Sequence, residues 1–160
     1  LYNVPGRTGI NMEPETTRKL SELINIKGIK EAAGSVEQVS NIVNICSDDF
    51  DVISGDDSLL LPMMSVGAKG VVSVLANFMP KEVSDLIKYV ENEEFEKAKK
   101  SHHKLYKLNK AMFCEPNPVP VKEAMSILGK IDPKVRLPLT KIDIENSKLL
   151  KKLMKKVEII

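Results

Sequence analysis

Aromatic residues and cysteines are scarce in this chain of 160 residues. It has no Trp, and aromatic residues make up only 4% of the total, so aliphatic side chains and Met must fill most of the core. With 42% hydrophobic residues the chain can bury one core of ordinary size. Cys46 and Cys114 are far apart in sequence and do not make a disulfide framework. Because free thiols favour a reducing compartment, we expect a cytoplasmic protein.

The chain also lacks an excess of charge of either sign and a long apolar run. Its 24 Lys and Arg residues nearly balance its 22 Asp and Glu residues. The small net charge of +2 therefore favours neither nucleic acid nor an anionic membrane as a partner. No apolar segment approaches the ~20 residues that span a bilayer. An initiating Met is absent, and residues 1–4 resemble the middle of a strand. We expect a piece of a longer protein.

Short apolar segments and amphipathic segments alternate over the first part of the chain. The segments 26–30, 51–54 and 71–74 are rich in β-branched residues, are apolar throughout, and are separated by segments with helical spacing. This pattern is typical of an α/β fold with a parallel sheet covered by helices. Together with the initial segment, four strands are expected. They could form a small open sheet or half of a (β/α)8 barrel, and the pattern does not choose between these.

The pattern changes near residue 92. Long amphipathic helices are predicted at 95–112, 118–128 and 146–157. We therefore expect two regions, a βα region over 1–92 and a helical C-terminal region over 93–160.

Lys30 is predicted to lie near the end of a short apolar strand, before a loop that contains Gly34. An ammonium that loses part of its hydration is more easily converted to the neutral amine, which attacks ketones to form a Schiff base. Ligands of parallel sheets bind at the carboxyl ends of the strands, where Tyr2, Arg7 and Gly55 are also expected. The alternative for Lys30 is a strand-end lysine that extends into solvent.

Five segments, taken together and in order, resemble the dihydrodipicolinate synthase family. They are Tyr2-Asn3-Val4-Pro5-Gly6-Arg7-Thr8-Gly9, Gly28-Ile29-Lys30-Glu31-Ala32, Ser54-Gly55-Asp56-Asp57, Gly70-Val71-Val72-Ser73-Val74 and Glu115-Pro116-Asn117-Pro118-Val119-Pro120-Val121-Lys122. The family belongs to the pyruvate-dependent class I aldolases, which have a (β/α)8 TIM barrel followed by helices. The resemblance implies that this chain is the second half of such an enzyme, beginning at the fifth barrel strand.

The resemblance also assigns roles to individual residues. It implies that Lys30 is the Schiff-base lysine and that Tyr2 is the tyrosine that shuttles protons. Arg7 matches the arginine that binds the carboxylate of the second substrate, for which a guanidinium is well suited. Gly55 and Val72 match positions whose backbone lies against the bound intermediate. For the acidic pair that follows, we expect Asp57 to cap a helix and Asp56 to be part of a loop, so neither is expected to be catalytic.

The implied reaction is the condensation of pyruvate with aspartate semialdehyde to 4-hydroxy-tetrahydrodipicolinate, in lysine and diaminopimelate biosynthesis. It would need no metal and no organic cofactor, because the imine on Lys30 is the electron sink. The implied partners are the complementary N-terminal half of the barrel and further copies, as a tetramer built from dimers. The chain alone is expected to be inactive. Two alternatives stay open: a sibling pyruvate aldolase such as N-acetylneuraminate lyase, and a non-catalytic half-barrel that acts as an assembly module.

Overall fold

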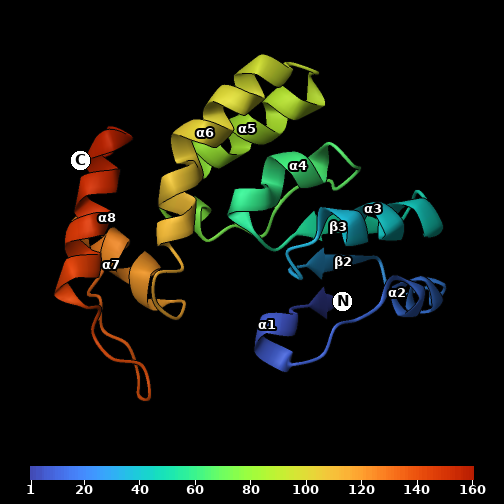
Figure 1. Ribbon diagram of the computed structural model, residues 1–160, viewed down its shortest axis with the longest axis horizontal. Helices are drawn as coiled ribbons and strands as arrows, with labels where there is room; N and C mark the ends of the chain where they lie inside the picture. Colours follow the sequence, from blue (N-terminus) through green and yellow to red (C-terminus); the bar gives the residue numbers. More distant parts are fainter. The chain divides into compact units, whose positions relative to one another are not determined.

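Parallel strands and helices alternate over the first unit of the protein. The computed structural model describes residues 1–160, which divide into two compact units, Leu1–Ser73 and Val74–Ile160. In the first unit β1 (Tyr2–Asn3), β2 (Gly28–Glu31) and β3 (Asp51–Ser54) form a three-stranded parallel sheet in that order (Figure 1). Parallel strands connected by helices occur both in open α/β sheets and in α/β barrels.

The helices of the first unit begin at residues that suit helix starts. Pro lies in the first turn of α1 (Pro5–Thr8) and of α2 (Pro14–Ser21). The hydroxyl of Ser35 accepts a hydrogen bond from the Gln38 N–H and caps α3 (Val36–Ile45). After β3 the chain continues through η1 (Asp57–Leu59) into α4 (Leu60–Met64).

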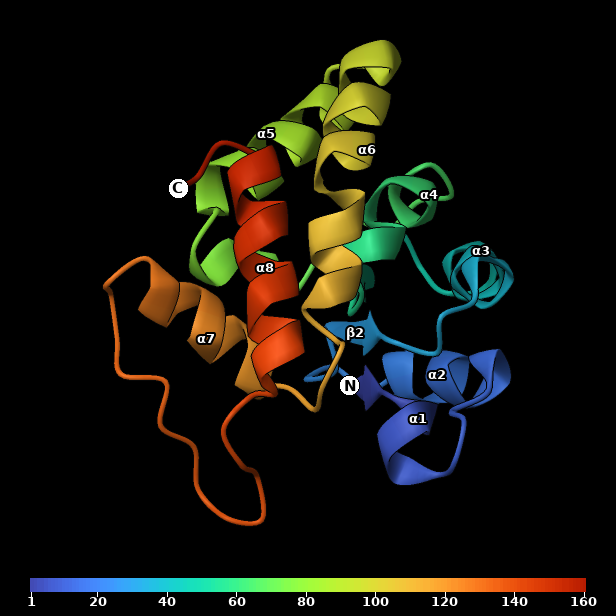
Figure 2. The same ribbon diagram turned by 60° about the vertical axis from the view of Figure 1, so that its left-hand side comes forward.

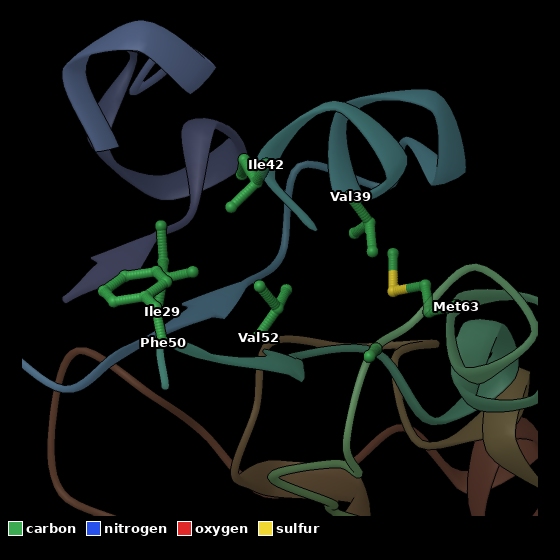
Figure 3. Close-up of a cluster of buried hydrophobic side chains, with 7 residues drawn as sticks. Ile29, Val39, Ile42, Phe50, Val52 and Met63 are labelled. Atoms are coloured by element: carbon green, nitrogen blue, oxygen red, sulfur yellow. The ribbon is translucent and has the colours of Figure 1, made fainter. Parts of the chain in front are cut away.

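The core of the first unit lies between the sheet and α3. Its buried residues come from β2, from the β3 segment, from α3 and from the end of the α4 segment: Ile29, Val39, Ile42, Phe50, Val52, Met63 and Ala68. Figure 3 shows Ile29 and Val52 on the strands and Val39 and Ile42 on α3, with Met63 beside Val39. Burial alternates along β2 and β3, because one face of the sheet packs on α3 while the other face is less buried.

The fourth expected strand, at 71–74, is reduced to one bridge. Val71 pairs with Ser54 in parallel, and the Val72 N–H donates to the Ser54 carbonyl at 2.8 Å. No ladder follows, because the chain turns into η2 (Leu75–Asn77) directly after Val74. β-branched residues favour extended backbone, but a strand also needs several consecutive partners.

Helices make up the second unit. They are η2, α5 (Pro80–Glu91), α6 (Phe95–Ala111), α7 (Val119–Ile127) and α8 (Ile144–Lys156). α5 contacts α6, and α8 contacts both α6 and α7, as Figure 2 shows. The predicted boundary near residue 92 falls between α5 and α6, inside this unit. Contacts group α5 with the helices that follow it, and the two compact units meet at residue 73 rather than near residue 92. The division into a barrel region over 1–92 and a helical region over 93–160 stays a prediction.

None of the helices combines the length and the apolar character that a bilayer crossing requires.

Candidate functional site

Lys30 and Tyr2 lie side by side on neighbouring strands. The register of β1 and β2 pairs them directly, and the Lys30 N–H donates to the Leu1 carbonyl at 3.0 Å. Because they are opposite each other in the ladder, their side chains leave the same face of the sheet. The Lys30 Nζ lies 4.2 Å from the centroid of the Tyr2 ring. An ammonium over an aromatic face is attracted by the ring quadrupole, which holds this amine at the phenol ring.

Gly55 lies against the stem of Lys30. A Cβ at residue 55 would be 2.6 Å from the Ala32 Cβ and 3.1 Å from the Lys30 Cε. The Gly55 N–H donates to the Glu31 carbonyl at 2.7 Å, so the backbone cannot easily move away. Glycine is therefore required here by close approach, and Tyr2, Lys30 and Gly55 form one cluster.

Arg7 and Val72 are not in contact with this cluster. Arg7 lies on α1, which begins two residues after β1, and its side chain is exposed. Val72 is 51% exposed, and its backbone is joined to Ser54, the residue before Gly55. Arg7 therefore follows the carboxyl end of β1, as expected, whereas Val72, expected inside a strand over 71–74, follows the single bridge at Val71. The roles predicted for Tyr2, Arg7, Lys30, Gly55 and Val72 stay predictions.

A buried polar cluster that the sequence analysis missed lies on the opposite face of the same strands. Glu31 is fully buried. Its carboxylate accepts hydrogen bonds from the Asn3 Nδ2 at 3.0 and 3.1 Å, from the Gln38 Nε2 at 3.0 Å and from the Ala33 N–H at 2.7 Å. Asn3 and Glu31 are paired in the ladder. A signal was present in the sequence, because Glu31 alternates with Lys30 and so occupies the face that Ile29 buries.

The cluster extends into the segment between α1 and α2. The Asn3 Nδ2 also donates to the Asn11 Oδ1 at 2.9 Å, and the Asn3 Oδ1 accepts from the Met12 N–H at 2.9 Å. Asn11 exchanges hydrogen bonds with Gln38 on α3, at 2.9 and 3.2 Å, and donates to Glu13. We call Asn3, Asn11, Glu31 and Gln38 the polar cluster.

The acidic pair after β3 is arranged differently from the expectation. The Asp56 Oδ1 accepts from the N–H and the hydroxyl of Ser58, so Asp56, not Asp57, caps the helical turn η1. Asp57 is buried and accepts a hydrogen bond from the Ser73 hydroxyl. The difference arises because η1 begins one residue earlier than the sequence indicates. Both carboxylates have hydrogen-bond partners, and that neither is catalytic stays a prediction.

The titratable groups with perturbed pKa values lie away from Lys30. Burial, and to a lesser extent His103, lowers the pKa of His102 on α6. Partial desolvation, and to a lesser extent the charge of Glu115, raises the pKa of the Cys114 thiol, although the residue is exposed. Hydrogen bonds to Glu15 and Glu22 raise the pKa of Arg18 on α2, where the three residues form exposed ion pairs. Over residues 1–160 no group of three or more His, Cys, Asp or Glu side chains could hold a metal ion.

Comparisons with known proteins agree on one family. A sequence model of the dihydrodipicolinate synthetase family matches residues 1–157. The 4-hydroxy-tetrahydrodipicolinate synthase of Geotalea uraniireducens is 51% identical over the whole chain, which covers 55% of that enzyme. The crystal structure of dihydrodipicolinate synthase from Aquifex aeolicus superposes with a TM-score of 0.94 at 44% identity, covering 97% of this chain and 53% of that one.

A third solved relative is the dihydrodipicolinate synthase of Acinetobacter baumannii, described as chloride inhibited and complexed with pyruvate. It has a TM-score of 0.96 and 38% identity, and covers 100% of this chain, which spans 55% of that one. The chain thus spans about half the length of the relatives it matches. The fraction of a relative that is matched does not say which part of it is matched. That the chain begins at the fifth barrel strand therefore stays a prediction.

Proposed function

The chain belongs to the dihydrodipicolinate synthetase family, and on this premise we propose that it carries the Schiff-base lysine of a class I aldolase. The substrates are pyruvate and aspartate semialdehyde, and the product is 4-hydroxy-tetrahydrodipicolinate, in lysine biosynthesis. The observation that carries the proposal is the 4.2 Å separation between the Lys30 Nζ and the centroid of the Tyr2 ring. It supports the proposal because the amine lies over the ring of a residue whose hydroxyl can both donate and accept a proton.

In the proposed reaction the Lys30 amine attacks the keto carbon of pyruvate. The resulting carbinolamine loses water, for which a proton must reach the departing hydroxyl, and a protonated imine remains. The imine accepts the electron pair of a methyl C–H bond as the proton leaves, which gives an enamine. The enamine carbon then attacks the aldehyde carbon of aspartate semialdehyde, and ring closure through the substrate amine frees Lys30. The Tyr2 phenol, which both donates and accepts, carries these protons.

The other predicted residues have binding roles in this proposal. Arg7 binds the carboxylate of aspartate semialdehyde through its guanidinium, and its exposed position after β1 leaves it open to a ligand. The backbone of Gly55 and Val72 borders the pyruvate-derived part of the intermediate. No metal and no organic cofactor takes part, since the protonated imine withdraws the electrons.

We further propose that turnover requires the complementary half of the barrel. Two observations support this: the chain spans 55% of the Geotalea relative, and its sheet has three strands rather than a closed ring. Assembly of the completed barrel into dimers and a tetramer, in the cytoplasm, is part of the same proposal.

Two other functions differ from the proposed one in whether an imine forms and in which substrates react. A sibling aldolase, such as N-acetylneuraminate lyase, would form the same imine but would prefer cleavage of a sugar acid to condensation with aspartate semialdehyde. A non-catalytic half-barrel would form no imine at all. Comparing condensation and cleavage substrates separates the first from our proposal, and imine trapping separates the second.

The test is to trap the imine on Lys30. The chain, supplied with the part of a relative that it does not match, is mixed with pyruvate, reduced with borohydride and analysed by intact mass and peptide mapping. We expect one reduced pyruvate per chain, on Lys30, and no adduct in Lys30→Ala. Lys27→Ala is the matched control, since Lys27 is an exposed lysine one residue before β2, and it should be trapped as the unchanged chain is. An unchanged chain without an adduct, or with the adduct on another lysine, contradicts the proposal.

A further inference from the structure

Glu31 is a fully buried carboxylate one residue from the proposed nucleophile. Removing a carboxylate from water costs free energy unless hydrogen bonds replace the hydration. Here the replacement comes from neutral donors only, two side-chain amides and the Ala33 N–H. An apolar residue would be the cheaper occupant of a face that otherwise packs Ile29 on α3. The location of this carboxylate therefore calls for a reason beyond packing.

The members of the polar cluster come from separate parts of the first unit. Of the two amides that donate to Glu31, Asn3 lies on β1 and Gln38 on α3, and both also donate to Asn11 in the segment between α1 and α2. Glu31 on β2 thus links an adjacent strand, a covering helix and the end of the segment that carries Arg7. Within such a network each hydrogen bond fixes the orientation of the next amide, because an amide that flips would place donor against donor.

The link between Glu31 and Asn3 is on the rung next to the site. β1 has only two residues and two registered pairs with β2, Tyr2 with Lys30 and Asn3 with Glu31. Two rungs of backbone pairing hold a strand weakly, so a buried side-chain link adjacent to the first rung sets where Tyr2 lies relative to Lys30. The polar cluster lies on one face of the sheet, and the Lys30 amine and the Tyr2 ring lie on the other face.

We propose that Glu31 is a positioning residue for the Lys30 amine and the Tyr2 phenol, acting through Asn3 and Gln38. This inference rests on the proposed function, because the step that Glu31 serves is imine formation with pyruvate. Glu31 itself does not touch the reacting atoms. It fixes β1 to β2 so that the phenol stays within reach of the amine, and misplacement by about 1 Å can cost about 100-fold in rate.

The test measures imine formation in the complemented chain with pyruvate as the probe. Trapped adduct is followed over time at several pyruvate concentrations, which gives a rate constant at saturation and a half-saturating concentration. In Glu31→Gln an amide N–H2 replaces one acceptor and faces a donor of the cluster. We expect the rate constant to fall at least about tenfold, with the half-saturating concentration within about twofold, since positioning and not pyruvate binding is lost.

Rescue distinguishes positioning from general damage. In the double variant Glu31→Gln with Gln38→Glu, the amide introduced on β2 can donate to the carboxylate introduced on α3. That carboxylate still accepts from the Asn11 Nδ2, and of the two bonds with Asn11 the one lost is the weaker one, from residue 38 to the Asn11 Oδ1. We expect the rate constant to return to within about threefold of the unchanged chain. Glu37→Gln, the same change at an exposed neighbour on α3, is the matched control and should leave the kinetics unchanged.

Each outcome decides the inference. A rate constant in Glu31→Gln within about twofold of the unchanged chain overturns it, and so does a double variant that stays as slow as the single one. If Glu31→Gln does not fold, the double variant alone decides by the same criterion. Absence of any adduct in the unchanged chain overturns the proposed function and this inference together, whereas normal adduct kinetics in every variant overturns this inference alone.

Discussion

At the scale of single residues, the surroundings of Lys30 differ from those of the other lysines. Lys69, Lys81 and Lys97 are exposed and form ion pairs with carboxylates, whose hydrogen bonds raise the pKa of each amine. Lys97 also has an aromatic ring near its amine, at 5.8 Å, in addition to its ion pair. Lys30 differs because its amine has no ion pair with a carboxylate, its aromatic ring is at 4.2 Å, and a glycine lies against its stem.

A substitution at Gly55 tests how closely the stem of Lys30 is held. In Gly55→Ala the new Cβ would meet the Ala32 Cβ at 2.6 Å, below any ordinary contact. We expect the free energy of unfolding to fall by about 1–3 kcal/mol, the usual cost of overpacking. We also expect slower trapping of pyruvate, because the Lys30 Cε must move. Urea unfolding and adduct kinetics measure the two effects.

Gly6→Ala is the matched control for this substitution. Gly6 is on α1, is exposed, and has no atom within 4 Å of an added Cβ. The free energy of unfolding of Gly6→Ala should be unchanged or higher by up to about 1 kcal/mol, because alanine loses less chain entropy on folding than glycine does. Equal unfolding midpoints for Gly55→Ala and the unchanged chain would show that the close approach is not a constraint.

The sequence predicted the relative positions of Lys30 and Tyr2, but it did not predict the contacts among the residues of the polar cluster. Lys30 and Tyr2 were placed at the same end of the sheet, and the register confirms that they are neighbours. The polar cluster was missed, because Asn3 and Asn11 are 28 and 27 residues from their partners Glu31 and Gln38 and meet them only when the strands pair and α3 packs on the sheet. Hydrogen bonds between distant segments leave no periodicity for a sequence pattern to reveal.

At the scale of elements, the long helices of the C-terminal region were predicted correctly. The segments predicted at 95–112, 118–128 and 146–157 correspond to α6, α7 and α8. The errors concern short elements, such as the four-residue helix α1, which was not predicted. The expected strand at 71–74 formed a single bridge. Elements of this length are decided by tertiary contacts rather than by local propensity.

The contribution of the α3 cap can be measured directly. Ser35→Ala removes the acceptor of the Gln38 N–H, which lies 3.0 Å from the Ser35 hydroxyl. We expect the free energy of unfolding to fall by about 1 kcal/mol, the usual cost of losing such a cap. The position of Gln38 in the polar cluster gives a second readout, because fraying of this turn should also slow imine trapping.

Ser40→Ala is the control within the same helix. Ser40 is exposed in the interior of α3, where alanine has the higher helix propensity, so stability should stay within about 0.5 kcal/mol or rise. If both serine variants unfold at the same urea concentration, the cap contributes nothing to the first unit.

At the scale of the whole molecule, the first unit presents an incomplete sheet. β1 pairs with β2 on one side only, and β3 continues only as a bridge to Val71. Parallel sheets occur almost always with both faces covered and, in barrels, with every strand paired on both sides. Open edges of this kind pair with other chains, so the chain should associate with a complement or with itself.

Complementation tests whether this incompleteness limits function. Residues 1–160 alone should give no turnover of pyruvate and aspartate semialdehyde above that of Lys30→Ala. Mixing them with the part of a relative that they do not match should restore turnover, because it closes the sheet and supplies the remaining wall of the site. The complement mixed with Lys30→Ala is the control and should stay inactive, since only this chain carries the nucleophile. Product is followed by its absorbance, and the association by sedimentation. Normal turnover by residues 1–160 without a complement would show that the three-stranded sheet already holds a complete site, and the requirement for a second half would be wrong.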